Sequence, residues 1–160
     1  MDFEALYAEQ FARVYRFLLG LCRNSDLAEE LAQETFTRAL RRSGQFSGQC
    51  DIATWLCSIA RNCYIDHCRL RQRETPMDTL PEGEAADFTD ALMDRERALR
   101  VHRALHSLPE PYKEVFSLRV FGELEHAQIC GLFGKSESWS RVTYYRAKAM
   151  IQQKLEEEEK

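Results

Sequence analysis

The sequence predicts an all-α protein of two small helical domains joined by a flexible acidic linker, with a helix-turn-helix in the second domain. Apolar residues recur at steps of three and four along most of the chain, and no segment alternates with a period of two. Prolines and acidic residues interrupt this pattern near the middle. Near the end, a three-residue break containing a glycine separates two helical stretches, which is typical of a helix-turn-helix.

The first domain, residues 1–73, is predicted to contain three helices. The first runs from about residue 2 to 22, and the second continues to about residue 42, with Asp26 and Glu29 expected to form its capping box. After a loop at residues 43–49, the third covers about residues 52–73. The side chains expected in the core of the second and third helices are Leu27, Leu31, Phe36, Leu40, Trp55, Leu56, Ile59, Ala60 and Cys63.

Residues 74–89 are predicted to form the linker. Pro76, Pro81 and Gly83 stand among acidic residues, a composition that disfavours a helix and repels itself. We therefore expect two separately packed domains on a tether.

The second domain, residues 90–160, is predicted to contain four helices. The first covers about residues 90–107, the second starts near Pro111 and reaches residue 120, the third covers about 124–133, and the fourth runs from 137 past 155. Pro111 suits the first turn of the second of these. Gly134 suits the positive φ that ends a helix, and Ser136 suits the cap of the next one.

Composition limits the classes of function. With 160 residues, 44% of them hydrophobic, the chain can bury a core, and its longest early apolar run, residues 17–22, is too short to span a membrane. We expect a cytoplasmic protein. The net charge of −4 does not exclude DNA, because residues 96–155 carry ten basic and six acidic side chains, and the excess acid lies in the linker and the C-terminal tail.

No metal, cofactor or catalytic site is expected. None of the six cysteines belongs to a Cys-x-x-Cys pair, so free thiols in a reducing compartment explain them better than disulfides. Zinc held by Cys63, His67 and Cys68, or metal held by His102 and His106, is the weaker alternative. No nucleophile with its base and no phosphate loop can be assembled, so we expect no enzyme.

Three stretches and one turn resemble the extracytoplasmic-function sigma factors, the minimal two-domain class of sigma factors of bacterial RNA polymerase. They are residues 26–40, 53–67 and 108–116, followed by the turn at Gly134. The resemblance covers nearly the whole chain in the family's order, with the linker in the family's place. It implies a protein that binds RNA polymerase core and promoter DNA.

The resemblance implies three sets of site residues. The second helix would bind a coiled coil of the largest polymerase subunit, and the second domain a flap-type element. The polymerase-binding set is Asp26, Glu29, Glu30, Gln33, Glu34 and Phe36. The set that melts DNA and reads the minus-ten element is Phe46, Ser47, Gln49, Arg61, Asn62, Asp66, His67 and Arg69. The helix-turn-helix set for the minus-thirty-five element is Lys135, Ser136, Glu137, Ser138, Trp139, Arg141, Val142, Tyr145, Arg146 and Lys148.

Each set has a plainer alternative. Acidic helix faces are most often only solvated, Asn62 and Asp66 share a face as many surface pairs do, and Trp55 fits the core better than a base platform. Val142 or Tyr145 is expected to be partly core. The helix at 124–133 lacks the family's Ser or Thr cap, and residues 141–143 depart from its usual triplet, so the promoter sequence is not predicted.

Two other functions compete with the resemblance. A stand-alone helix-turn-helix regulator would explain the second domain, and a helical adaptor would bind protein only. The regulator does not explain the helix at 26–36 or the aromatic, arginine-rich third helix, and binding to purified polymerase core separates the three functions. From the resemblance we also expect an anti-sigma factor, through which alone the chain would contact a membrane.

Overall fold

The computed structural model describes residues 2–48, 50–74 and 92–159, which form helices and no strand. The seven α-helices and one short 3-10 helix are α1 (Phe3–Cys22), α2 (Ser25–Arg41), η1 (Ser43–Gln45), α3 (Ile52–Glu74), α4 (Leu92–His106), α5 (Tyr112–Val120), α6 (His126–Phe133) and α7 (Glu137–Glu158). The all-α prediction is confirmed for these residues. The predicted linker lies almost wholly outside them.

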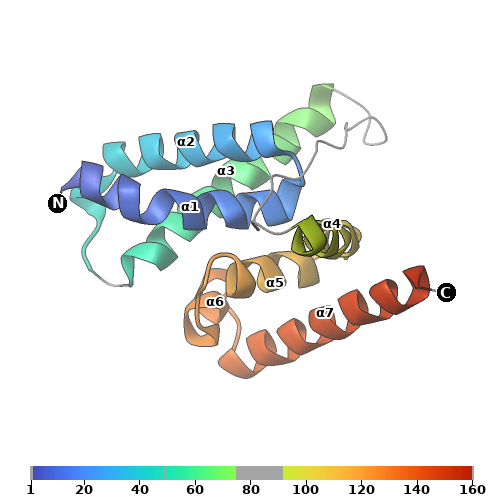
Figure 1. The fold of residues 1–160 in the computed structure, drawn as a ribbon. Helices are drawn as coiled ribbons and strands as arrows, with labels where there is room; N and C mark the ends of the chain where they lie inside the picture. Colours follow the sequence, from blue (N-terminus) through green and yellow to red (C-terminus); the bar gives the residue numbers. More distant parts are fainter. Residues whose placement is uncertain (1, 49, 75–91, 160) are drawn as a thin grey trace.

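The first domain consists of α1, α2 and α3, which lie together in Figure 1. Phe36 of α2 fills its centre at 2% exposure and contacts the rings of Phe3, Tyr7 and Phe11, with centroids 5.0–6.3 Å apart. Such a cluster of aromatic rings removes a large apolar area from water, which stabilises the three-helix unit.

Two local expectations for α2 were wrong. Its N-cap is Asn24, whose side-chain oxygen accepts the Leu27 N–H at 3.1 Å, so Asp26 lies inside the first turn as a favourable negative charge. Leu40, which was expected in the core, is 55% exposed. It lies one residue beyond buried Ala39, so the helix turns it to the solvent side.

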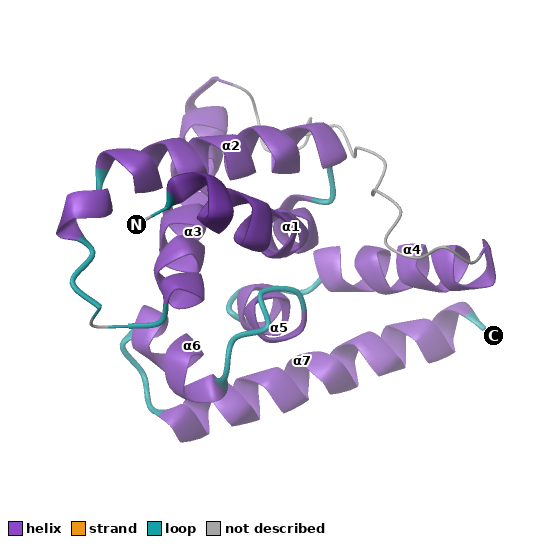
Figure 2. Cartoon of the chain, turned by 60° about the vertical axis from the view of Figure 1, so that its left-hand side comes forward, coloured by secondary structure: helices purple, strands orange, loops and turns teal. Residues whose placement is uncertain are grey.

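The second domain is built around α5, which lies between α1 and α7 in both views (Figures 1 and 2). The predicted turn between α6 and α7 is confirmed: Gly134 has φ 64°, and the Ser136 hydroxyl accepts the Trp139 N–H at 3.1 Å. At the start of α6, the Gln128 side chain accepts the Glu125 N–H at 2.9 Å, which replaces the missing Ser or Thr cap.

The two domains contact each other, contrary to the expectation of separate packing. The buried cluster of the first domain continues into Val115, Leu118, Leu124 and Ile129 of the second. A smaller cluster, which includes Leu105, Phe116 and Ile151, belongs to the second domain alone. We call this contact between the domains the seam. Apolar spacing indicates which face of a helix is buried, but not which helix covers it.

None of the helices in the described part of the chain has the length and the apolar content that a bilayer span requires.

Candidate functional site

The outer face of α7 is a solvent-exposed surface on which basic residues predominate. Val142 and Tyr145 are 44% and 62% exposed, so the expectation that one of them is partly core was wrong. Around them lie further exposed residues of the predicted helix-turn-helix set, which are Lys135, Ser136, Glu137, Ser138, Arg141, Arg146 and Lys148. Arg141 pairs with Glu137 one turn earlier. A basic helix face with exposed apolar and aromatic groups suits the major groove of DNA.

The opposite face of α7 is fixed to the domain. Ser140, Thr143, Ala147 and Ile151 are buried along it. The Ser140 hydroxyl lies 2.9 Å from Nδ1 of His126. Trp139, which was predicted among the base-proximal residues, is half-buried against the ring of Phe133, with centroids 5.2 Å apart. The inner face therefore sets the orientation at which the outer face is presented.

The predicted polymerase-binding set is mostly exposed on α2. Asp26, Glu29, Glu30 and Gln33 are exposed, and Glu34 is half-buried. The Gln33 amide also donates to the Tyr7 hydroxyl at 2.9 Å, which ties this face to α1. Phe36 lies in the core, as its apolar spacing predicts, so within this set it supports the polar face from behind and offers a partner no surface of its own.

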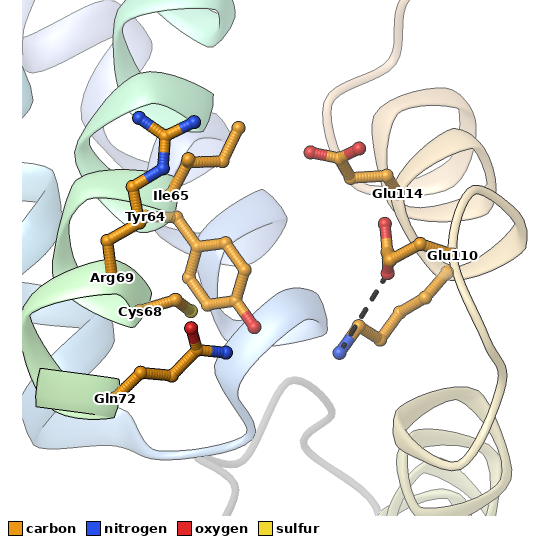
Figure 3. A pocket seen from close by; sticks show the side chains of 8 residues that line it. Tyr64, Ile65, Cys68, Arg69, Gln72, Glu110 and Glu114 are labelled. Atoms are coloured by element: carbon orange, nitrogen blue, oxygen red, sulfur yellow. Dashed lines mark ion pairs between the residues drawn. The ribbon is translucent and has the colours of Figure 1, made fainter. Parts of the chain in front are cut away.

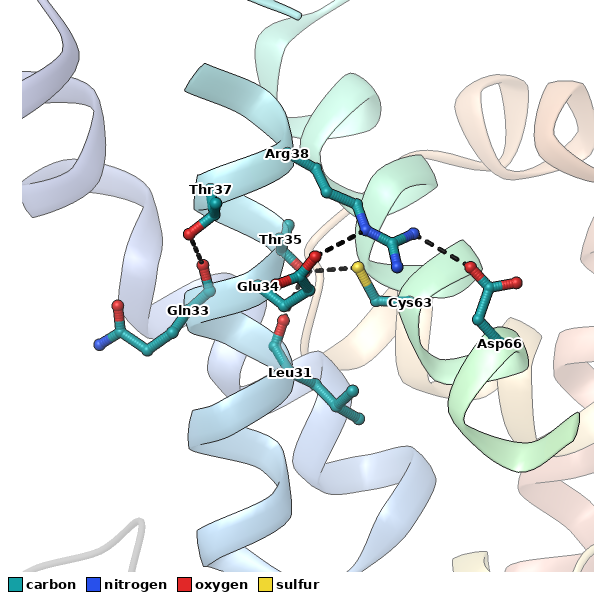
Figure 4. A network of polar contacts seen from close by, with 8 residues as sticks. All are labelled: Leu31, Gln33, Glu34, Thr35, Thr37, Arg38, Cys63 and Asp66. Carbon is teal, nitrogen blue, oxygen red and sulfur yellow. Dashed lines mark hydrogen bonds and ion pairs between the residues drawn. The ribbon is translucent and has the colours of Figure 1, made fainter. Parts of the chain in front are cut away.

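Arg38 joins the acidic face of α2 to α3 (Figure 4). Its guanidinium donates to Glu34 at 3.0 Å and to Asp66 at 3.1 Å. The hydrogen bond to Glu34, followed by the one to Asp66, raises the pKa of Arg38 above its ordinary value. Sequence reasoning singled out both carboxylates but missed Arg38. Its spacing of four residues from Glu34 was the available signal.

The predicted minus-ten set lies on the exposed side of α3 and in the loop before it. Asn62 and Arg69 are exposed, and His67 is half-buried. Phe46 packs on Trp55 with ring centroids 4.9 Å apart, and both residues are half-buried. Trp55 therefore belongs only partly to the core, and Phe46 covers part of its ring. Ser47 is exposed, and Gln49 lies outside the described residues. This face combines polar groups with an aromatic pair, as single-strand binding requires.

Arg61 has a different environment from the rest of its set. Its Nε donates to Glu114 of α5 at 2.8 Å, and its guanidinium lies 4.5 Å from the ring centroid of Phe133 in α6. Glu114 is only 6% exposed. A minus-ten candidate is thus bound by two residues of the other domain. The sequence carried no signal for this, because Glu114 lies 53 residues away.

A cavity of about 350 Å³ lies next to Glu114, which is one of its lining residues (Figure 3). Tyr64, Ile65, Cys68 and residues further along α3 line one side, and Glu110, Lys113 and Glu114 line the other. Lys113 lies 3.9 Å from Glu110 and 6.0 Å from the Tyr64 ring centroid. The cavity therefore belongs to the seam, between charged groups of α5 and the turn before it on one side and an aromatic residue of α3 on the other.

The described cysteines and histidines do not form a metal site, since no three His, Cys, Asp or Glu side chains are grouped there. Burial raises the pKa of the Cys57 thiol to about 12 and of Cys22 to about 11, which keeps both protonated. His102 is buried and stacks on Phe121 at 5.1 Å. Burial, followed by the charge of Arg23, lowers its pKa to about 4, so the ring is neutral at pH 7.

Two family models match the chain: Sigma-70 region 2 over residues 6–74 and Sigma-70 region 4 over residues 98–151. The RNA polymerase sigma factor CarQ of Myxococcus xanthus is 31% identical over 97% of this chain and 90% of its own. The ECF RNA polymerase sigma factor RpoE of Cereibacter sphaeroides is 30% identical over 82% and 76%. A solved structure of the sigma factor RpoE of Bartonella quintana, in complex with the anti-sigma factor NepR, has a TM-score of 0.82 at 21% identity and covers 97% of both chains.

Proposed function

Because this chain belongs to the extracytoplasmic-function sigma factors, which bind RNA polymerase core and direct it to promoters, we propose that three of its helices divide that task. The acidic face of α2 binds the polymerase. The exposed side of α3 takes up the separated minus-ten strand, and the outer face of α7 reads the minus-thirty-five element. The exposed basic face of α7, held in place by its buried inner face, is the observation that carries the assignment.

The chemistry of each face supports this division. On α7, arginine and lysine side chains give affinity through phosphates, while Val142 and Tyr145 lie where base edges and methyl groups pass in the major groove. On α3, Asn62 and Arg69 offer hydrogen-bond donors to unpaired bases and phosphates. None of these steps needs a catalytic group, since binding energy alone holds the strands apart.

We also propose that an anti-sigma factor is among the partners of this chain. The structurally similar RpoE of Bartonella quintana was solved with an anti-sigma factor, which supports the expectation that an anti-sigma factor also binds this chain in the cytoplasm.

Reconstitution with purified bacterial core polymerase tests the assignment of α2. We expect Glu30→Lys, on the exposed face of α2, to weaken core binding about tenfold by reversing the charge toward a basic partner. Glu9→Lys, at an exposed position of α1, is the matched control and should bind as the wild type does. Equal losses for both variants, measured by fluorescence anisotropy, would contradict the assignment, and transcript mapping would identify the promoters.

A further inference from the structure

The seam contains a charge pair whose position suggests regulation. We propose that Glu114 is an autoinhibitory residue, whose carboxylate holds Arg61 in the closed chain and keeps α3 from DNA until the domains separate. The proposal rests on the proposed role of α3 in binding the minus-ten strand.

The Glu114 carboxylate accepts a hydrogen bond from the Arg61 guanidinium, in the place that a DNA phosphate would take. The Arg61 Nε donates to the Glu114 carboxylate at 2.8 Å, and the face of its guanidinium is covered by Phe133 at 4.5 Å. A phosphate oxygen would need the same donors. Because both covering residues come from the second domain, Arg61 cannot be released to DNA while the seam is closed.

The pair favours an all-or-none opening. Glu110 lies close to Glu114: burial, followed by the charge of the Glu114 carboxylate, raises the pKa of the Glu110 carboxyl to about 7, which favours its neutral form. If Arg61 left while the seam stayed shut, Glu114 would be a buried carboxylate without its cation, which is strongly unfavourable. When the domains part, water solvates both partners. The two stable arrangements are therefore closed and paired, or open and solvated.

Close packing at Gly20 seals the seam at a second point. A Cβ atom added at Gly20 would lie 2.8 Å from the Ser117 hydroxyl oxygen and 2.9 Å from the Phe121 ring, both in the second domain. The rim adds the Arg13–Glu123 ion pair at 3.1 Å and a hydrogen bond from Gln128 to Asp51 at 3.3 Å. The closed arrangement thus does not depend on the Arg61 pair alone.

The closed form cannot reach both promoter elements. Their centres, about 25 base pairs apart, are separated by roughly 85 Å at 3.4 Å per base pair. Two touching domains of this size, each with a radius of gyration of about 11 Å, have centres far closer than that. The seam must therefore open when the polymerase spaces the two domains along a promoter.

Two variants open the seam by independent means. Glu114→Gln keeps the shape of the side chain but removes the charge that holds Arg61. Gly20→Ala changes neither charged residue and instead wedges the domains apart at a second point of the seam. Gly131→Ala is the matched control, because it is also a helical glycine but has nothing within 4 Å of an added Cβ.

The free chains are compared by small-angle scattering and by anisotropy with a labelled single-stranded DNA from a promoter used by the holoenzyme. We expect Glu114→Gln and Gly20→Ala to exceed the radius of gyration of about 15 Å typical of a compact chain of this length, and to bind the strand about fivefold more tightly. Gly131→Ala should match the wild type.

Wild-type dimensions in both variants, or opening with no gain in DNA binding, would overturn the proposal. If Glu114→Gln fails to fold by circular dichroism, Gly20→Ala decides. A separate measurement concerns the proposed function: Arg61→Gln in the holoenzyme should reduce promoter opening, and normal opening would refute the DNA role of this face without reference to the seam.

Discussion

The two helices that we propose bind DNA, α3 and α7, differ in how far they are exposed. The outer face of α7 is open to solvent, with Tyr145 the most exposed of its large hydrophobic residues, whereas α3 has its Arg61 bound by the second domain. Both faces carry the residue types that bind nucleic acid. The difference shows that composition marks a binding face, while packing decides whether the face is available in the free chain.

The largest expected effect tests whether the two domains share one hydrophobic core at the seam. Leu118 of α5 is fully buried in the cluster that extends into the first domain, so Leu118→Ala should cost about 2–5 kcal/mol. Trp55 and Trp139 report on one domain each in single-tryptophan variants unfolded by urea. We expect Leu118→Ala to lower both midpoints. Ile151→Ala, in the cluster of the second domain alone, should lower only the Trp139 midpoint.

The next effect concerns the stability in acid that depends on the buried His102 of α4. The neutral form of His102 is favoured in the folded chain, since its pKa falls from 6.5 to about 4. Its contribution to stability is complete above pH 6.5 and is lost as the pH falls toward 4, by up to about 3 kcal/mol. Urea unfolding at a series of pH values should show a shallower acid loss for His102→Gln. An identical slope in both proteins would contradict a buried neutral ring.

A smaller effect, on promoter binding, is expected at the outer face of α7. Because Tyr145 is 62% exposed, Tyr145→Ala should change the free energy of unfolding by less than about 0.5 kcal/mol. If Tyr145 contacts bases, the same change should weaken promoter binding by the holoenzyme by about 1–3 kcal/mol. Filter binding on a mapped promoter measures this. A loss of stability instead of binding would place Tyr145 with the inner face of α7.

The smallest effect is expected at the rim of the seam. Arg13 and Glu123 form a half-exposed ion pair, with side chains 31% and 58% accessible. Solvent screens such a pair, so Arg13→Gln should cost less than about 1 kcal/mol and leave the scattering profile unchanged. Opening by this variant alone would mean that the rim, rather than Gly20 and Glu114, closes the domains.

Local sequence signals predicted most of the helices. Gly134 and Ser136 mark the end of α6 and the start of α7, because helix ends need a positive φ and a side-chain acceptor. The errors arose where several local solutions were available. Asn24 caps α2 in place of Asp26, since it lies one residue before the helix begins.

The candidate site was predicted less completely, because surface availability depends on packing between distant segments. Phe36 was assigned both to the core and to the polymerase-binding set, and it lies in the aromatic core, as its apolar spacing predicts. The pairing of Arg61 with Glu114 joins residues 53 apart, which no local pattern specifies. Helix periodicity fixes which face is apolar, but not which neighbour covers it.

The guanidinium of Arg38 has a consequence for how variants of this chain should be interpreted. One cation holds both Glu34 of α2, the proposed polymerase-binding helix, and Asp66 of α3, the proposed strand-binding helix. A genetic screen for defective polymerase attachment would therefore also recover lesions in strand opening whenever Arg38 is hit. Phenotypes at this position report on two surfaces at once, and only paired changes at its two anions can tell them apart.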